Sequence, residues 1–229
     1  MFYLLIIFCL SLCFLTLPWL NKTWRLWQWR KALGLRTKQK IFNKLYHLVN
    51  GFLLSQKARQ RKDSPELVYG EIEFESFVAL ISITKPNKDT VFYDLGSGTG
   101  KAVIAASLVF AMKKSVGIEL LEELHLCAHS QKERLLAIAA QEAKTTNIQF
   151  KRANFLNENV NEASLIFINA TAFFGEHWLV ISKKLEELNQ DTIVISSSKK
   201  LKSNQFKHLY STHLTMSWGI VEAFIQQRN

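Results

Sequence analysis

Residues 93–100 read Tyr-Asp-Leu-Gly-Ser-Gly-Thr-Gly, and they join a short apolar stretch that predicts a strand to a stretch that predicts a helix. In a parallel sheet the first such turn must bring its backbone close to a ligand at the carboxyl ends of the strands. Gly96, Gly98 and Gly100 suit this turn, because glycine has no Cβ to hold a ligand away and tolerates positive φ. The segment therefore predicts a strand–turn–helix unit with a ligand-binding edge.

The spacing of the turn indicates which ligand it holds. Gly-x-Gly-x-Gly differs from the Gly-x-Gly-x-x-Gly of a dinucleotide site, and Asp94 stands two residues before the first glycine. An aspartate there repels a pyrophosphate but attracts the ammonium of a methionine moiety. Glu119 ends the next predicted strand, where an acid can accept the ribose hydroxyls of a nucleoside. Asn154 and Phe155 end the third, where they can meet an adenine, although Phe155 can equally belong to the core. We therefore expect S-adenosylmethionine as the cofactor.

The rest of the chain from residue 65 predicts alternating strands and helices. The expected strands are Val91–Asp94, Ser115–Glu119, Ile148–Arg152, Leu165–Asn169 and Thr192–Ser196, followed by β-rich stretches near Phe206–Thr212 and Trp218–Ile225. The expected helices are Glu73–Ile83, Lys101–Met112, Glu122–Lys144 and Phe174–Leu188. This alternation is typical of a mostly parallel sheet with helices on both faces, here a Rossmann-like sheet of seven strands.

The amino-terminal part predicts a membrane anchor. Residues 1–20 carry no charged side chain and match the roughly 20 apolar residues that cross a bilayer. A cleaved signal peptide is the alternative, but no basic residue precedes the apolar run and no small-residue cleavage site follows it. Residues 21–62 then hold twelve basic and no acidic residues, with tryptophans among them. Basic residues stay on the cytoplasmic side, so we expect a single-pass membrane protein with its catalytic domain on the cytoplasmic or organelle-matrix side.

These patterns divide the chain into an anchor over 1–20, a basic neck over 21–64 and one domain over 65–229. The neck predicts an amphipathic helix over Lys38–Lys62, whose apolar face holds Ile41, Phe42, Leu45, Leu48, Val49, Phe52 and Leu53. Such a helix can pack on the domain, or it can lie on anionic lipid. Nucleic-acid binding is the less favoured use of the charge, because most of the excess lies beside the expected span. We expect a monomer.

From about Val68 onward the ordered motifs resemble the catalytic domain of the disruptor-of-telomeric-silencing enzymes, the histone-lysine methyltransferases without a SET domain. The segments that carry the resemblance are Val68–Glu71, Asp94–Gly100, Gly117–Glu119, Phe167–Phe173, Ile195–Lys199 and Met216–Trp218. The most discriminating is Phe167–Phe173, which is similar to the Asn-Asn-x-Ala-Phe segment of that family. The resemblance implies a lysine acceptor on a protein and a loop, Val68–Glu71, that closes over the methionine end of the cofactor.

Residue by residue, the resemblance and the turn together imply one cofactor site and one acceptor channel. The expected cofactor contacts are Tyr69, Glu71, Asp94, Gly96, Gly98, Gly100, Lys101, Glu119, Asn154, Phe155 and Asn169. Catalysis and the acceptor channel are expected at Asn169, Tyr69, Phe173 and Trp218.

Some positions depart from the family. Ala170 replaces its second asparagine, Asn154 its aspartate, and Lys101 its glutamine, while a basic carboxyl-terminal extension is absent. These departures leave the cofactor in place but put a histone substrate in doubt. The anchor and neck are also similar to short membrane-anchored lysine methyltransferases of an ATP synthase subunit.

Methyl transfer from a sulfonium requires alignment and exclusion of water more than a nucleophilic triad. We expect an aromatic channel to lower the pKa of the acceptor lysine by desolvation, and Asn169 to orient the reacting groups. His125 and His129 are four residues apart on a predicted helix, but no third ligand accompanies them, so no metal is expected. A small-molecule or lipid-linked acceptor and a catalytically silent cofactor-binding module are the alternatives.

Overall fold

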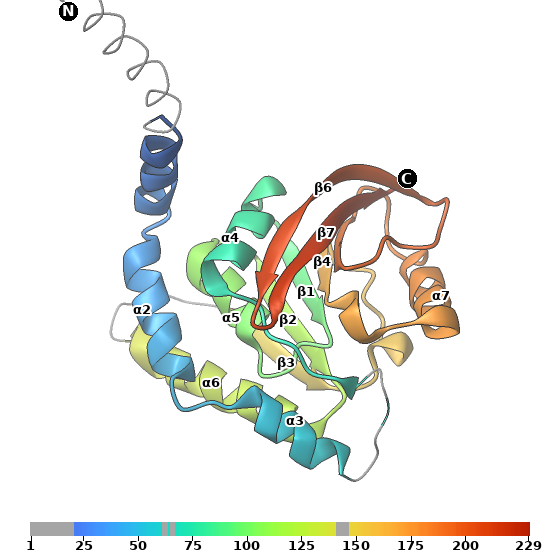
Figure 1. Cartoon of the computed structure of the whole chain (residues 1–229), viewed down its shortest axis with the longest axis horizontal. Coiled ribbons are helices and arrows are strands. Elements are labelled where there is room, and N and C mark those ends of the chain that lie inside the picture. Colours follow the sequence, from blue (N-terminus) through green and yellow to red (C-terminus); the bar gives the residue numbers. More distant parts are fainter. Residues whose placement is uncertain (1–20, 61–63, 65–66, 141–146) are drawn as a thin grey trace, which may run out of the picture. The chain divides into compact units, whose positions relative to one another are not determined.

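The computed structural model describes residues 21–60, 64, 67–140 and 147–229 of the 229-residue chain (Figure 1). The chain separates into two compact units, one up to Lys40 and one over Ile41–Asn229. In the first unit, residues 21–32 are helical and α2 (Leu35–Tyr46) begins. The expected membrane span over 1–20 lies outside the described residues. Among the helices that are described, none is long and apolar enough to cross a bilayer.

The second unit is built on a sheet of seven strands. Their bounds are β1 (Val91–Leu95), β2 (Lys114–Glu119), β3 (Ile148–Arg152), β4 (Leu165–Ile168), β5 (Ile193–Ser197), β6 (Phe206–Met216) and β7 (Gly219–Arg228). The strand order is β3-β2-β1-β4-β5-β7-β6, with β1 to β5 parallel and β7 antiparallel to both of its neighbours. From β1 the chain adds β2 and β3 on one side, and it then returns to add β4 and β5 on the other side of β1. Ligands bind in such folds at this switch point, between β1 and β4. The predicted Rossmann-like sheet is confirmed.

One further helix precedes β1, and three connect β1 to β2, β2 to β3 and β4 to β5. They are α4 (Phe74–Ile83), α5 (Lys101–Val109), α6 (Glu122–Ala140) and α7 (Gly175–Leu185). Side chains alternate between the two faces of each strand, so Phe92 and Phe167 point to one face, where Phe77 of α4 meets both rings edge-on at 6.3 and 5.2 Å between centroids. Phe77 and Phe92 are fully buried.

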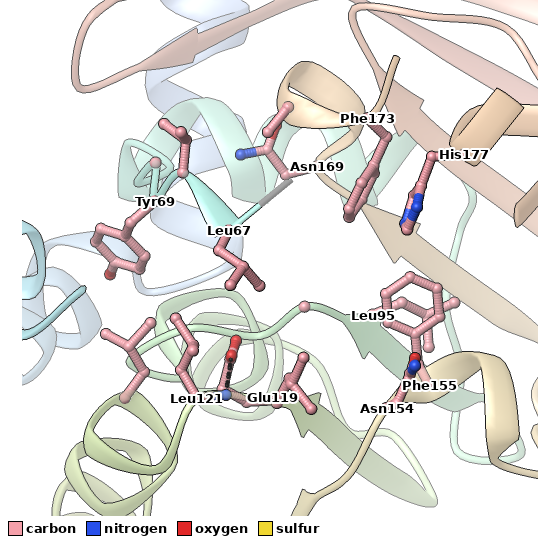
Figure 2. A pocket seen from close by; sticks show the side chains of 16 residues that line it. Leu67, Tyr69, Leu95, Glu119, Leu121, Asn154, Phe155, Asn169, Phe173 and His177 are labelled. Carbon is pink, nitrogen blue, oxygen red and sulfur yellow. Dashed lines mark hydrogen bonds between the residues drawn. The ribbon is translucent and has the colours of Figure 1, made fainter. Parts of the chain in front are cut away.

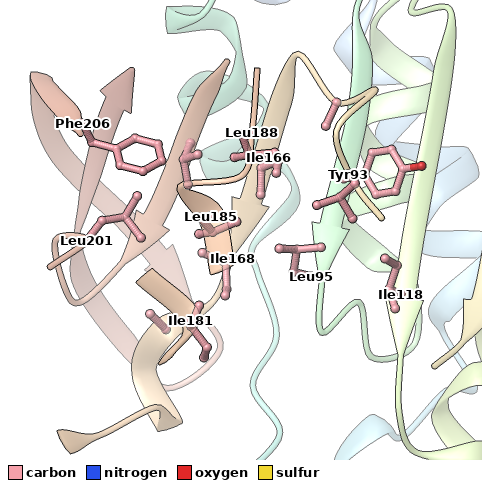
Figure 3. Packing of buried hydrophobic residues seen from close by; sticks show 14 of the residues in the cluster. Tyr93, Leu95, Ile118, Ile166, Ile168, Ile181, Leu185, Leu188, Leu201 and Phe206 are labelled. Atoms are coloured by element: carbon pink, nitrogen blue, oxygen red, sulfur yellow. The ribbon is translucent and has the colours of Figure 1, made fainter. Parts of the chain in front are cut away.

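The opposite face of the sheet packs against α7 (Figure 3). Tyr93, Ile166 and Ile168 come from the alternate positions of β1 and β4, and Ile181 and Leu185 come from α7. Each of these side chains is almost completely buried. At about 25 cal/mol per Å² of apolar surface, such side chains contribute roughly 1.5–3 kcal/mol each. The two packed faces hold the strand ends rigid around the site.

The prediction of a single neck helix over Lys38–Lys62 was wrong. The structure has two helices there, because α2 ends at Tyr46 and Asn50 caps the start of α3 (Gly51–Arg59). Its side-chain oxygen accepts the backbone N–H of Leu53 at 3.1 Å. The inward face of α3 is made of the small residues Gly51, Ser55 and Ala58, and the helix packs against α6.

Other bounds differ by a few residues. The helix expected to reach Met112 ends at Val109, since Phe110 is extended, and the helix expected to reach Leu188 ends at Leu185. The last part of the helix expected over Glu122–Lys144 falls on residues 141–146, outside the described residues. The two carboxyl-terminal stretches are longer than expected and form one hairpin.

Candidate active site

A pocket opens at the carboxyl ends of β1, β2 and β4 (Figure 2). Residues from five separate parts of the chain line it. Those expected from the sequence are Tyr69, Gly96, Glu119, Asn154, Phe155, Asn169 and Phe173. Val68 and Gly70 belong to the loop that was expected to close over the cofactor. The sequence did not point to Leu67, Leu95, Leu120, Leu121, Leu124, Ala172 and His177. The structure thus brings seven of the expected cofactor and acceptor residues together in one pocket.

The glycine turn holds the acid at the end of β2. Gly96, Gly98 and Gly100 have φ of 83°, 54° and 81°, in the region that favours glycine. The turn aims the N–H of Gly98 at Glu119 Oε2 at 2.8 Å, while the N–H of Leu121 donates to Oε1 at 2.8 Å. Each carboxylate oxygen keeps a lone pair for a further donor. The side chain is therefore oriented in advance to accept the two hydroxyls of a ribose.

Burial changes the titration of two acids at this edge. Desolvation raises the pKa of Asp94 well above its ordinary value, and the nearby Glu119 raises it further. Desolvation likewise raises the pKa of Glu119, although the backbone N–H groups of Leu121 and Gly98 oppose the shift. Asp94 is buried beneath the turn and does not line the pocket. A cationic ligand group would favour its ionised form.

The adenine end expected after β3 is formed by a single turn of 3-10 helix, η2 (Phe155–Asn157). Asn154 caps it, and its side-chain oxygen accepts the N–H of Leu156 at 3.0 Å. Phe155 lines the pocket and meets Phe173 edge-on, with ring centroids 6.0 Å apart. The ring thus faces both the pocket and the edge of the hydrophobic core.

Asn169 follows β4 and caps the turn η3 (Ala170–Ala172). Its Oδ1 accepts the hydroxyls of Ser197 at 2.6 Å and Thr171 at 2.9 Å, and the N–H of Thr171 at 3.4 Å. The N–H of Ala170 donates to Ser197 Oγ at 3.1 Å, so the Ser197 proton is directed to Asn169. Because the backbone N–H of Thr171 can only donate, the amide has one orientation. Its Nδ2 remains as the donor that Asn169 offers to a pocket ligand.

Aromatic side chains wall the far end of the pocket (Figure 2). Phe173 stacks on His177 with centroids 5.4 Å apart and an angle of 18° between the planes. Lys199 braces the turn beside them, since its Nζ donates to the carbonyls of Ala170 at 2.8 Å and Thr171 at 3.0 Å. Desolvation lowers the pKa of Lys199. The arrangement gives a largely apolar wall with one amide donor at its edge.

Residues 67–71, which we call the lid, cover the opposite side of the pocket. Tyr69 Oη lies 2.8 Å from Thr99 Oγ1 and donates to Glu71 Oε1 at 2.9 Å, while its ring packs over Gly98. Glu71 also pairs with Lys101 at 2.6 Å, with only 12% and 16% of the two side chains exposed. Glu71 and Lys101, both expected to contact the cofactor, thus contact each other, and neither lines the pocket. Gly98 and Gly100 likewise shape the turn without lining the pocket.

Trp218 lies behind the lid. It occupies the turn of the β6–β7 hairpin, and its ring covers Gly70 so closely that a Cβ at residue 70 would overlap it. The N–H of Ser217 donates to the carbonyl of Glu71 at 2.9 Å. Trp218 does not line the pocket, but it supports the lid residue that does.

The residues that sequence analysis missed had weak signals. His177 lies in the first turn of α7, but the scattered histidines of the sequence suggested no cluster. Thr99 and Ser197 act through contacts that only the fold creates. Within the described residues, no group of three histidine, cysteine, aspartate or glutamate side chains is arranged to hold a metal ion.

Comparison with known proteins gives the family. Residues 53–221 match the model of the family described as "Histone methylation protein DOT1". This match extends over well more than half of the chain. The chain belongs to this family.

Individual relatives of the DOT1 family are distant. A histone-lysine N-methyltransferase, H3 lysine-79 specific, from Candida glabrata is 27% identical over 154 residues, which are 62% of this chain and 23% of that protein. A protein-lysine N-methyltransferase from Saccharolobus islandicus is 29% identical over 118 residues, 51% of this chain and 67% of that protein. The chain thus spans about a quarter of the first relative and two thirds of the second.

Solved structures agree on the fold. An RNA methyltransferase from Salinibacter ruber in complex with S-adenosyl-L-homocysteine has a TM-score of 0.52 and 21% identity, covering 66% of this chain and 89% of that one. Magnesium protoporphyrin IX methyltransferase from Synechocystis has a TM-score of 0.55 and 13% identity, covering 84% and 95%. The DOT1-family chain therefore has the class I methyltransferase fold, and its cofactor is S-adenosylmethionine.

Proposed function

We propose that this chain is a membrane-anchored methyltransferase that transfers the methyl group of S-adenosylmethionine to a lysine of a protein. The observation that carries the proposal is the pocket itself. One end presents the preoriented carboxylate of Glu119 beside the glycine turn, and the other presents the amide of Asn169 beside Phe173. A cofactor and an acceptor can therefore meet inside one hollow.

The residues present fit this cofactor. Glu119 would accept the ribose hydroxyls, Asp94 beneath the turn would balance the ammonium, and Phe155 would lie against the adenine. When bound, the cofactor supplies an electrophilic methyl group on a sulfonium. The protein then has to align the acceptor and exclude water.

The far end of the pocket suits an amine acceptor. The stacked rings of Phe173 and His177 form an aromatic wall there, and desolvation beside the Phe173 ring would lower the pKa of a lysine so that its neutral, nucleophilic form is reached more easily. Asn169 would position the acceptor or the cofactor through Nδ2. Its braced Oδ1 keeps the amide from rotating, which is what a positioning group requires.

The protein-lysine acceptor is also supported by the relatives named above, whose names specify protein lysine in both cases. A histone is not favoured, because this chain departs from the family at Ala170, Asn154 and Lys101. A small-molecule or lipid-linked acceptor and a silent cofactor-binding module are the competing functions.

The membrane location rests on sequence alone. Residues 1–20 are uncharged and apolar, and the twelve basic residues of 21–62 follow at once. This order supports a single span with the catalytic domain on the cytoplasmic or organelle-matrix side.

The test is to incubate the purified full chain, in mild detergent, with membranes and methyl-labelled S-adenosylmethionine, and to locate the label by mass spectrometry. Label on protein lysine supports the proposal. Label on a lipid or metabolite replaces it with the small-acceptor function, and cofactor binding without any label supports the silent module. An Asn169→Ala chain is the matched control, because it keeps Glu119 and the glycine turn and should bind cofactor while losing most transfer.

A further inference from the structure

The first turn of α3 exposes large apolar side chains, whereas the exposed positions of its next turn, Gln56 and Lys57, are polar. Gly51, Ser55 and Ala58 face inward, while Phe52 and Leu53 face outward, with Leu53 60% exposed. Leu48, just before the helix, is 81% exposed. This reverses the usual arrangement, in which the large apolar side chains of a surface helix face the core.

This apolar face continues onto the lid and the hairpin. Phe52 meets the Tyr69 ring edge-on at 5.4 Å between centroids, and Val68, the preceding lid residue, is half exposed at the pocket. Trp218 covers Gly70 on the other side of the lid, and Ile220 beside it is 70% exposed. We call Leu48, Phe52, Leu53, Val68, Trp218 and Ile220 the rim surface, because they follow one another around the lid side of the pocket.

The charge around α3 matches an anionic surface. Residues 41–62 contain five lysines and arginines and no acidic residue. The carboxylate of Glu71, which lies beside Leu48 and Phe52, is neutralised by Lys101. Side chains that combine exposed leucine and phenylalanine, a tryptophan and flanking basic residues are typical of segments that lie in the headgroup region of a bilayer.

We propose that the rim surface docks on an anionic lipid bilayer, with its apolar side chains at the level of the headgroups and the pocket mouth beside them. The rim side chains project singly from a helix, a loop and a hairpin turn. A fluid bilayer can accommodate such projections without a complementary shape, and the basic flank selects anionic lipid. This inference deepens the proposed function and rests on it for its purpose, since it places the acceptor lysine near the membrane surface.

Spin-label accessibility tests the docking. The full chain, with its three cysteines replaced by alanine, carries one nitroxide at Leu53→Cys or, as the control, at Leu179→Cys, an exposed leucine of α7. Each protein is reconstituted in phosphatidylcholine vesicles with or without phosphatidylglycerol. Collisions with oxygen, which concentrates in lipid, are compared with collisions with a water-soluble nickel chelate, and cofactor binding confirms that both labelled chains are folded.

In anionic vesicles the oxygen-to-nickel ratio at residue 53 should exceed that at residue 179 several-fold, and it should fall when phosphatidylglycerol is omitted. Equal ratios at the two positions in folded protein would overturn the docking and indicate a protein partner for this face. Lipid contact at residue 53 in a chain that transfers no methyl group would instead leave the docking intact and remove the proposed function.

Discussion

The ion pair between Lys101 and Glu71 should contribute strongly to the stability of the second unit. We predict that Lys101→Met lowers the free energy of unfolding by about 2–3 kcal/mol. Removing one partner of a buried pair costs roughly 3–5 kcal/mol, because the other charge stays desolvated, and a charged hydrogen bond is worth about 1.5–3 kcal/mol. The predicted cost is below that of a fully buried pair because 16% of the Lys101 side chain and 12% of the Glu71 side chain remain exposed to water. Tyr69 also still donates to Glu71 in the variant.

The assay is thermal and urea unfolding of the full chain in mild detergent. Glu71→Gln combined with Lys101→Met should recover most of the loss, since no buried charge is then left unpaired. Lys184→Met is the matched control: its pair with Glu187 has the same 2.6 Å separation, but 58% of the glutamate is exposed, so its loss should cost less than about 1 kcal/mol. If Lys101→Met costs no more than Lys184→Met, or if the double variant is no more stable than the single one, the argument from burial fails.

Three further predictions concern the pocket. Asn169→Ala should lower kcat about 100-fold at saturating cofactor, as expected for a lost positioning group, and unchanged turnover in a stopped assay would remove that role. Gly70→Ala should weaken cofactor binding roughly tenfold in calorimetry, about 1.4 kcal/mol, because the new Cβ displaces Trp218; adding Trp218→Ala should restore it. Since burial raises the pKa of Asp94 and of Glu119, both acids become neutral at a higher pH than exposed ones, so cofactor affinity should fall as the pH is lowered through that raised range. A titration that shows constant affinity there would contradict this assignment.

The sheet could be predicted well because its signals are local. Strands β1, β4 and β5 are short, mainly apolar runs, and the spacing of Gly96, Gly98 and Gly100 predicts the turn directly. The prediction of one neck helix was wrong because the spacing of apolar residues by three and four positions was continued through residues 47–50. The pair Asn50–Gly51 is a cap followed by a helix start, and that capping signal should have outweighed the periodicity.

The composition of the site could be predicted, but its contacts could not. Glu119 and Asn169 were expected in the pocket, yet the groups that orient them, Gly98, Ser197 and Thr171, come from other strands or turns. Pairings between residues far apart in the chain leave no periodic pattern in a single sequence. The Lys101–Glu71 pair shows this most clearly, since a basic and an acidic residue 30 positions apart were both assigned to the cofactor.

Gly70 makes the boundary between the pocket and the hairpin only one peptide unit thick. Its inner side lines the pocket and its outer side carries the Trp218 ring. The shape of the cavity is thus set partly by Trp218, which does not line it. Variation at the hairpin turn can therefore alter which acceptors fit without changing any residue of the pocket wall.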